Sequence, residues 1–96
     1  MTILQARLMA AARPAQLRFI ASAINALTVR NRAYYGDRDF PRMMEGNEAV
    51  HRLSGYLRDL TDAGEELSES RADGICEQLG FLPQVEVGRI LQHSPL

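Results

Sequence analysis

Two runs of apolar residues, each advancing along the chain in alternating steps of three and four, constrain the fold more than any other feature. The first run consists of Leu17, Ile20, Ile24, Leu27 and Tyr34, with Asn31 at the remaining position. The second run consists of Met43, Gly46, Val50, Leu53, Leu57 and Leu60. A 3-4 repeat places side chains on one narrow stripe of an α-helix, and such a stripe packs against a neighbouring helix.

The stretch between the two runs contains residues that end and begin helices. Gly36 is predicted to supply the left-handed residue that commonly ends a helix. Asp39 is suited to the N-cap of the next helix, and Pro41 to its first turn. The sequence therefore predicts an antiparallel hairpin of two long helices, over residues 14–35 and 41–61.

Short helices are predicted on both sides of this hairpin. Residues 2–12 have a helical pattern, and Pro14 disfavours helix at the preceding residue, so the chain should break there. Ser68 is a predicted N-cap for a helix over residues 69–79. A last helix opens at Pro83, and the chain end beyond it is expected to fray. The prediction is one all-α domain over residues 1–96, with the long hairpin at 14–61 and short C-terminal helices within 69–92.

The apolar arc of the first long helix is wider than one partner helix can cover, since the run is extended by Phe19, Ala23, Ala26 and Ala33. Either the short helices cover the remainder, or a second copy of the hairpin does. Two hairpins related by a two-fold axis form a four-helix bundle, which is a frequent solution for small chains. A homodimer is therefore expected.

Charge is distributed unevenly although the formal net charge is only −1. Residues 1–42 contain seven Arg and two acids, whereas residues 43–96 contain four Arg and ten acids. Such asymmetry can mark a nucleic-acid or membrane surface, or it can bring two halves or two subunits together. The small net charge favours the second explanation. No stretch approaches the roughly 20 apolar residues that a transmembrane helix needs.

The single cysteine, Cys76, excludes an intrachain disulfide and a cysteine zinc site. Its neighbours Ile75 and Leu79 indicate a small buried hydrophobe. A reducing, cytoplasmic location fits this usage.

Polar residues flank the apolar stripes on one side of each long helix. They are Asn25, Thr28 and Arg32 on the first helix, and Asn47, His51, Ser54 and Arg58 on the second. Like flanks of an antiparallel pair face each other, so His51 should lie near Asn25 and Thr28, and Asn47 near Arg32. We interpret Asn25, Arg32, Asn47 and His51 as a structural hydrogen-bond network that fixes the register of the hairpin. A ligand or ion site on the same strip is the alternative.

A metal site and a catalytic site both lack support. Glu48 and His51 have the Glu-x-x-His spacing of helical di-iron ligands, but such a site needs further inward carboxylates. Residues 1–36 contain no acid, and Glu48 points away from the stripe. The sequence therefore predicts no metal, no cofactor and no enzymatic activity.

Residues 72–92 resemble a helix-turn-helix loosely, which makes DNA binding the alternative function. The second helix of that segment carries Glu86 and only one Arg, Arg89. Phosphate contacts require a cationic face, and this half of the chain is acidic. Nucleic-acid binding therefore ranks below the binding of another protein.

Residues 20–60 also resemble a group of small, uncharacterised helical proteins of proteobacteria. The resemblance is carried by Asn25-Ala-Leu-Thr28, Arg32, Tyr35 and Asn47-Glu-Ala-Val-His-Arg-Leu-Ser54. It implies that the polar strip is a family feature, and it implies no activity. Taken together, the sequence predicts a non-enzymatic protein–protein interaction or regulatory module.

Overall fold

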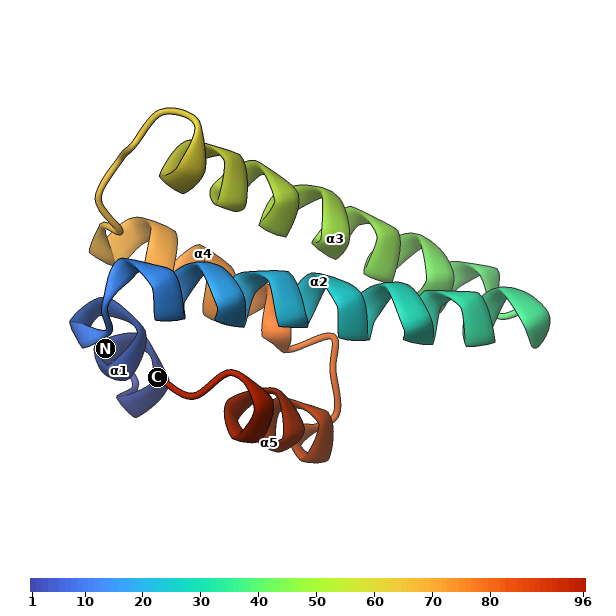
Figure 1. The fold of residues 1–96 in the computed structure, drawn as a ribbon. Coiled ribbons are helices and arrows are strands. Elements are labelled where there is room, and N and C mark those ends of the chain that lie inside the picture. The colour runs from blue at the N-terminus through green and yellow to red at the C-terminus, as the bar shows by residue number, and fades with distance from the viewer.

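The two apolar runs lie on two long antiparallel helices in the computed structural model, which describes residues 1–96 (Figure 1). Helix α2 spans Arg13–Gly36 and helix α3 spans Phe40–Thr61. Both runs contribute buried residues to the interior, and Ile20, Leu27 and Leu53 have at most 1% of their surface exposed. The predicted all-α fold is confirmed.

The turn between α2 and α3 is built differently from the prediction. Arg38, and not Gly36, has the left-handed backbone, with φ at 59°. The Asp39 N–H donates to the Tyr34 carbonyl at 2.8 Å, and the Arg38 N–H donates to the Tyr35 carbonyl at 3.1 Å. This pair of bonds defines a Schellman motif with Arg38 at its left-handed position. The prediction for Gly36 is wrong because α2 continues through that residue before the chain reverses.

The start of α3 follows the sequence closely. The Asp39 side chain accepts a hydrogen bond from the Arg42 N–H at 3.4 Å, as an N-cap residue does. Pro41 lies in the first turn, where its missing N–H leaves no helical bond unmade. Both predictions are confirmed.

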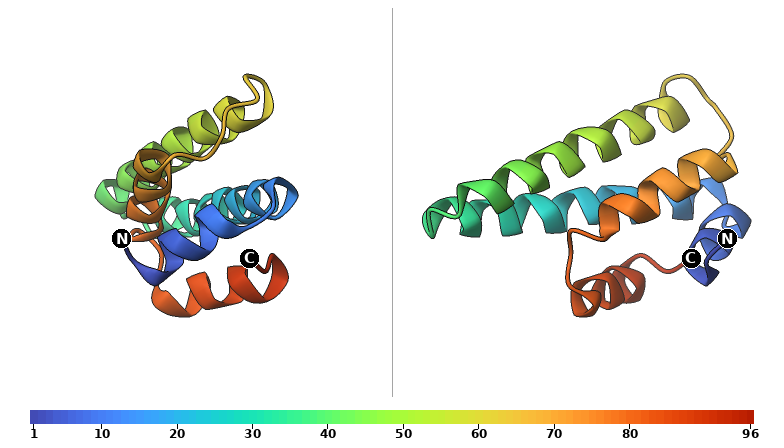
Figure 2. Two further views of the ribbon diagram at one scale, coloured as in Figure 1. Left: turned by 90° about the vertical axis from the view of Figure 1, so that its left-hand side faces the viewer. Right: turned by 180° about the vertical axis from the view of Figure 1, so that it is seen from behind.

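Three short helices pack around α2 and α3 (Figure 2). They are α1 over Ile3–Ala10, α4 over Glu69–Leu79 and α5 over Gln84–His93. Helix α4 lies behind the hairpin, where it contacts α1 and α3, and α5 contacts α2. Ser68 caps α4 by accepting from the Arg71 N–H at 3.1 Å, which confirms the predicted start of that helix. None of the five helices combines the length and apolar character needed to cross a bilayer.

The chain end after α5 is held more firmly than expected. Ser94 has only 6% of its surface exposed, and its hydroxyl lies 2.6 Å from the Ser22 hydroxyl on α2. Leu96 packs against the hydrophobic core. The expected fraying is therefore wrong for these residues, because a hydrogen bond and an apolar contact return the tail to the core.

Gly46 marks the closest approach of α3 to α2. A Cβ at this position would overlap the Asn31 side-chain oxygen and lie 2.7 Å from Asn31 Cγ. Only glycine leaves room for the buried Asn31 amide, whose Nδ2 donates to Asn47 Oδ1 at 3.1 Å. The Asn31 oxygen itself is buried and has no hydrogen-bond partner. The Asn31 side chain is therefore enclosed between α2 and α3 where the two helices pack most closely.

The connector after α3 is fastened by Arg13 at the start of α2. The Arg13 guanidinium donates to the backbone carbonyls of Leu60, Gly64 (3.3 Å) and Glu65 (2.8 Å). A second arginine, Arg71 on α4, pairs with Asp59 at 3.5 Å and with Glu65. Arg13 thus supplies a donor for the Leu60 carbonyl in the last turn of α3, which helix geometry leaves without a partner, and ties two connector carbonyls to α2.

Candidate functional site

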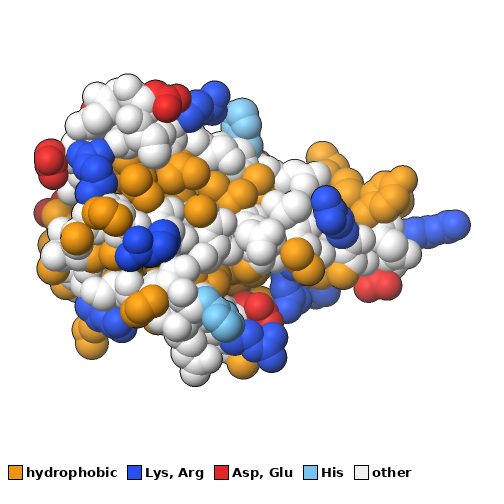
Figure 3. All heavy atoms as spheres, viewed as in Figure 1, with side chains coloured by type: hydrophobic (Ala, Val, Ile, Leu, Met, Phe, Trp, Pro, Cys, Tyr) orange, Lys and Arg blue, Asp and Glu red, His pale blue; other side chains and the backbone are white.

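One long face of the hairpin is covered by the short helices, and the opposite face is bare. On the covered side, Phe19 and Ala23 of α2 and Ala49 of α3 have no exposed surface. Figure 3 shows the bare side, with α4 hidden behind it. We call this side the open face. Its flanking residues are Arg18, Ala21, Asn25, Thr28, Arg32 and Tyr35 on α2, and Phe40, Met44, Asn47, His51, Ser54 and Arg58 on α3.

The flanks of α2 and α3 meet on this face because residues three and four apart share one side of a helix. At one end of this face, beside the turn between α2 and α3, the rings of Tyr35 and Phe40 are edge-on with centroids 6.2 Å apart. These two rings are 65% and 47% exposed, and neighbouring Met44 is 66% exposed. The hairpin end therefore presents an exposed apolar cluster that extends beyond the other helices (Figures 1 and 3).

A strip of apolar side chains forms the floor between the two flanks. Leu17 and Ile24 of α2 and Val50 and Leu57 of α3 are half-buried, and they pack against the core from this side. Figure 3 shows hydrophobic side chains gathered between α3 and α2. No part of this chain covers them, so the floor can still bury apolar surface against another molecule.

The open face is cationic. Arg18, Arg32 and Arg58 all lie on it, together with His51, and none of the three arginines makes an ion pair, whereas Arg13, Arg42, Arg52, Arg71 and Arg89 do. The flanks contain no Asp or Glu. The acids of α3 occupy positions turned away from this face, and α2 contains none. Asp62, the helical C-cap of α3, lies on the same side as Arg58 four residues earlier and makes no ion pair with it, so the three arginines leave this face with a net positive charge.

The four residues singled out from the sequence all lie on the open face. Asn25, Arg32, Asn47 and His51 are exposed. Asn47 bonds to Asn31 rather than to Arg32. The imidazole side chain of His51 makes no hydrogen bond. The hydroxyls of Thr28 and Ser54 instead donate to the carbonyls four residues earlier in their own helices, each at 2.8 Å. The structure thus brings these residues to one surface but not into one network.

We expect His51→Ala to change the free energy of unfolding by no more than about 0.5 kcal/mol, because the side chain is exposed and unbonded. Urea denaturation of the variant and the wild type measures this difference. A loss of 1 kcal/mol or more, taken as about the value of one net hydrogen bond, would restore the role in register that the sequence suggested.

Two features of the site were not predicted from the sequence, namely the Asn31–Asn47 pair and the lack of acids along the flanks. Asn31 was assigned to the apolar stripe, and its pairing with Asn47 depends on the space at Gly46, which no local pattern reveals. The absence of acid from both flanks was visible in the sequence. It could have been found by assigning each charge to a helix position instead of counting charges over halves of the chain.

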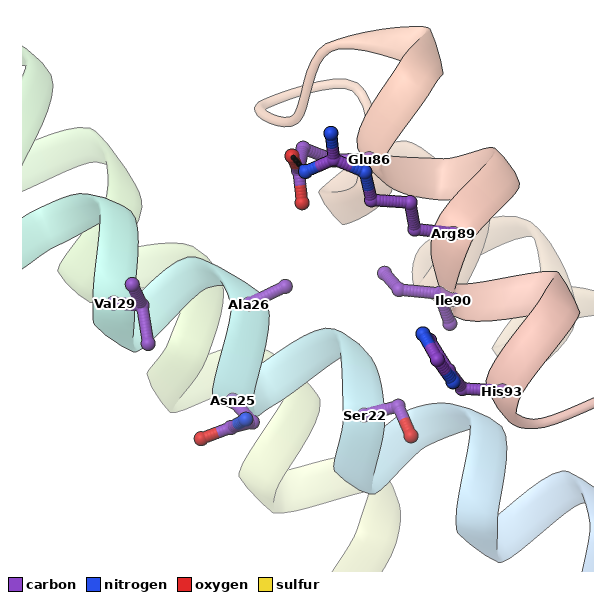
Figure 4. Close-up of a pocket in the computed structure, with 8 residues that line it drawn as sticks. All are labelled: Ser22, Asn25, Ala26, Val29, Glu86, Arg89, Ile90 and His93. Carbon is purple, nitrogen blue, oxygen red and sulfur yellow. Dashed lines mark hydrogen bonds and ion pairs between the residues drawn. The ribbon is translucent and has the colours of Figure 1, made fainter.

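A separate pocket of about 380 Å³ lies between α2 and α5 (Figure 4). Ser22, Ala26 and Val29 of α2 face Ile90 and His93 of α5 across it. At its edge, Arg89 and Glu86 form an ion pair at 2.7 Å, and so the charges of this pocket compensate one another. Asn25 lies at the border between this pocket and the open face.

Cys76 on α4 is the one thiol of the chain. Burial, with a smaller contribution from the Asp73 carboxylate, raises the pKa of the Cys76 thiol, which disfavours the nucleophilic thiolate. No three His, Cys, Asp or Glu side chains lie close enough together to hold a metal ion. What the open face offers is apolar contact area, guanidinium groups and amides, which suit binding.

Comparison with known proteins adds no assignment, since no family model, curated protein or solved structure matches the chain.

Proposed function

We propose that this protein is a non-enzymatic interaction module that binds another protein through the open face of its α2–α3 hairpin. The observation that carries the proposal is the half-buried strip of Leu17, Ile24, Val50 and Leu57, which lies uncovered between two exposed flanks. A partly exposed apolar strip of this kind can bury the apolar side of a helix. The exposed cluster at the hairpin end extends the same surface.

A second copy of the chain is the other candidate occupant. Two hairpins packed open face to open face would form the four-helix bundle and the homodimer expected from the sequence. The apolar floor favours such self-association, and the unpaired arginines on the same face oppose it. Sedimentation of the free protein at several concentrations measures its mass and decides between the two occupants.

The structure gives less support to DNA binding through residues 72–92. In a helix-turn-helix, the two helices form one unit, with the first helix supporting the second in the major groove. Here α4 contacts α1 and α3, while α5 contacts α2. The relationship to small proteobacterial helical proteins remains part of this proposal and supplies no activity.

We expect Ala21→Trp to block partner binding, because this exposed position lies on the α2 flank of the open face. An indole there would obstruct a partner that packs on this face. Ala6→Trp is the matched control, since Ala6 is exposed on α1. The measurement is chemical cross-linking and affinity capture from the cells that make the protein, with both variants and the wild type. The proposal requires proteins captured by the wild type and by Ala6→Trp to be lost with Ala21→Trp. Equal capture by all three, or capture of nothing by a monomeric wild type, contradicts it.

A further inference from the structure

We infer that the open face binds an acidic amphipathic helix of a partner protein. This inference rests on the proposed function and adds the chemistry of the partner. Two independent properties of the face carry it, namely its net positive charge and the apolar strip between its flanks.

The charge requires carboxylates on the partner. Arg18, Arg32 and Arg58 are exposed and make no ion pair, and only Asp62 at the end of α3 adds an acid to these flanks. Charged groups at a rim steer association and select partners of opposite charge. Guanidinium groups match carboxylates particularly well because their planar forks bond both oxygens. A partner with Glu or Asp on both sides of an apolar stripe satisfies this surface.

The apolar strip favours a helix over other anions. Half-buried Ile24 and Val50 lie beside exposed Asn25 and His51, so an apolar strip runs between two polar flanks. The stretch from Arg18 to Tyr35 is about 26 Å long at 1.5 Å per residue, so it accommodates roughly 17 residues of a helix. An amphipathic helix presents a matching apolar stripe with charged residues on both sides. A nucleic acid has no apolar stripe to bury these side chains.

The same charge argues against a second copy as the main occupant. Two open faces in contact would place Arg18, Arg32 and Arg58 of one copy against a face that also has a net positive charge. Like charges across an interface are unfavourable unless counter-charges accompany them. An acidic helix avoids this repulsion while it buries the same apolar floor.

Synthetic peptides test the inference with the intact protein. The probe is a helix-forming peptide of about 18 residues, which matches the length of the open face along α2. It has Leu in 3-4 steps and Glu and Ala at the other positions. Two comparison peptides have Lys in place of Glu, or Ala in place of Leu. Binding is measured by fluorescence anisotropy at low and high salt, and duplex DNA and vesicles of anionic lipid are tested as competitors.

The paired variants separate charge from other effects. Arg18→Glu with Arg32→Glu reverses two charges on the open face, whereas Arg7→Glu with Arg52→Glu makes the same change at exposed arginines elsewhere, on α1 and on the side of α3 turned away from this face. We expect the first pair to weaken binding of the Leu/Glu peptide at least about tenfold and the second pair much less. High salt should weaken binding as well.

Several results would overturn the inference. They are equal binding of the Leu/Lys peptide, equal binding of the Glu peptide that lacks Leu, no binding of any peptide, or tighter binding of DNA or vesicles at the same face. Ala21→Trp distinguishes these failures from failure of the proposed function. If that variant still loses its captured protein while the Leu/Glu peptide does not bind, the open face is an interaction site for a partner of different chemistry.

Discussion

Gly46→Ala should lower the free energy of unfolding by about 1–2 kcal/mol, although alanine is the better helix former. A Cβ at position 46 would overlap the Asn31 side-chain oxygen, and Asn31 is buried and bonded to Asn47. The amide must therefore move, and its hydrogen bond breaks or α3 shifts away from α2. Urea denaturation followed by circular dichroism measures the change.

Gly55→Ala is the matched control for Gly46→Ala, because Gly55 lies in the same helix and has nothing within 4 Å of an added Cβ. It should raise stability by up to about 1 kcal/mol, the difference in helix propensity. Adding Asn31→Ala to Gly46→Ala should recover most of the loss, since the overlapping oxygen is then gone. Two glycine variants of equal stability, or no recovery in the double variant, would mean that α2 and α3 do not approach as described.

Arg13→Ala should lower the free energy of unfolding by about 2 kcal/mol, because one guanidinium donates to backbone carbonyls both in the last turn of α3 and in the connector that follows it. It donates to the carbonyls of Leu60, Gly64 and Glu65, and it lies 3.8 Å from the Glu66 carboxylate. Without it, these carbonyls must find water, and the connector should open more often. Urea denaturation gives the stability, and amide hydrogen exchange over residues 62–68 reports the local opening.

Two variants define what Arg13 contributes. Arg13→Lys keeps the charge but not the planar fork, so it should recover only part of the loss. Arg18→Ala removes an exposed, unpaired arginine of the same helix and should change stability by less than about 0.5 kcal/mol. Equal losses for Arg13→Ala and Arg18→Ala would show that the contacts with the connector contribute no stability.

Much of the fold could be predicted because its information is local. The 3-4 spacing of residues such as Ile20 and Leu53 identified the long helices, and the side chains of Asp39 and Ser68 identified two helix starts. These features depend on neighbours within one or two turns. The prediction that Gly36 ends the first long helix was wrong because the helix continues through Gly36 and the chain reverses at the following residues. Arg38 adopts the left-handed conformation there, which costs a residue with a side chain more than it costs glycine.

The site was harder to predict from the sequence than the fold, because it depends on which side of the α2–α3 hairpin the short helices cover. The residues of the predicted polar flanks lie on one surface, but the one hydrogen bond between the two helices at these residues joins Asn47 to Asn31 of the apolar stripe. The inferred network around His51 assumed half-burial, and that would have required another helix above this face. The short helices instead pack on the opposite side, which is a long-range outcome. Exposure turns the same residues into a surface available for binding.

The most direct test of the open face is a methyl NMR titration with the Leu/Glu peptide. We expect the methyl signals of Ile24, Val50 and Leu57, three of the four floor residues, to shift in the wild type and not in Ala21→Trp. Val29 and Val85 are internal controls, since both are exposed but lie on other surfaces, and their methyl signals should stay in place. Shifts at Val29 and Val85 with the floor unmoved would contradict the account.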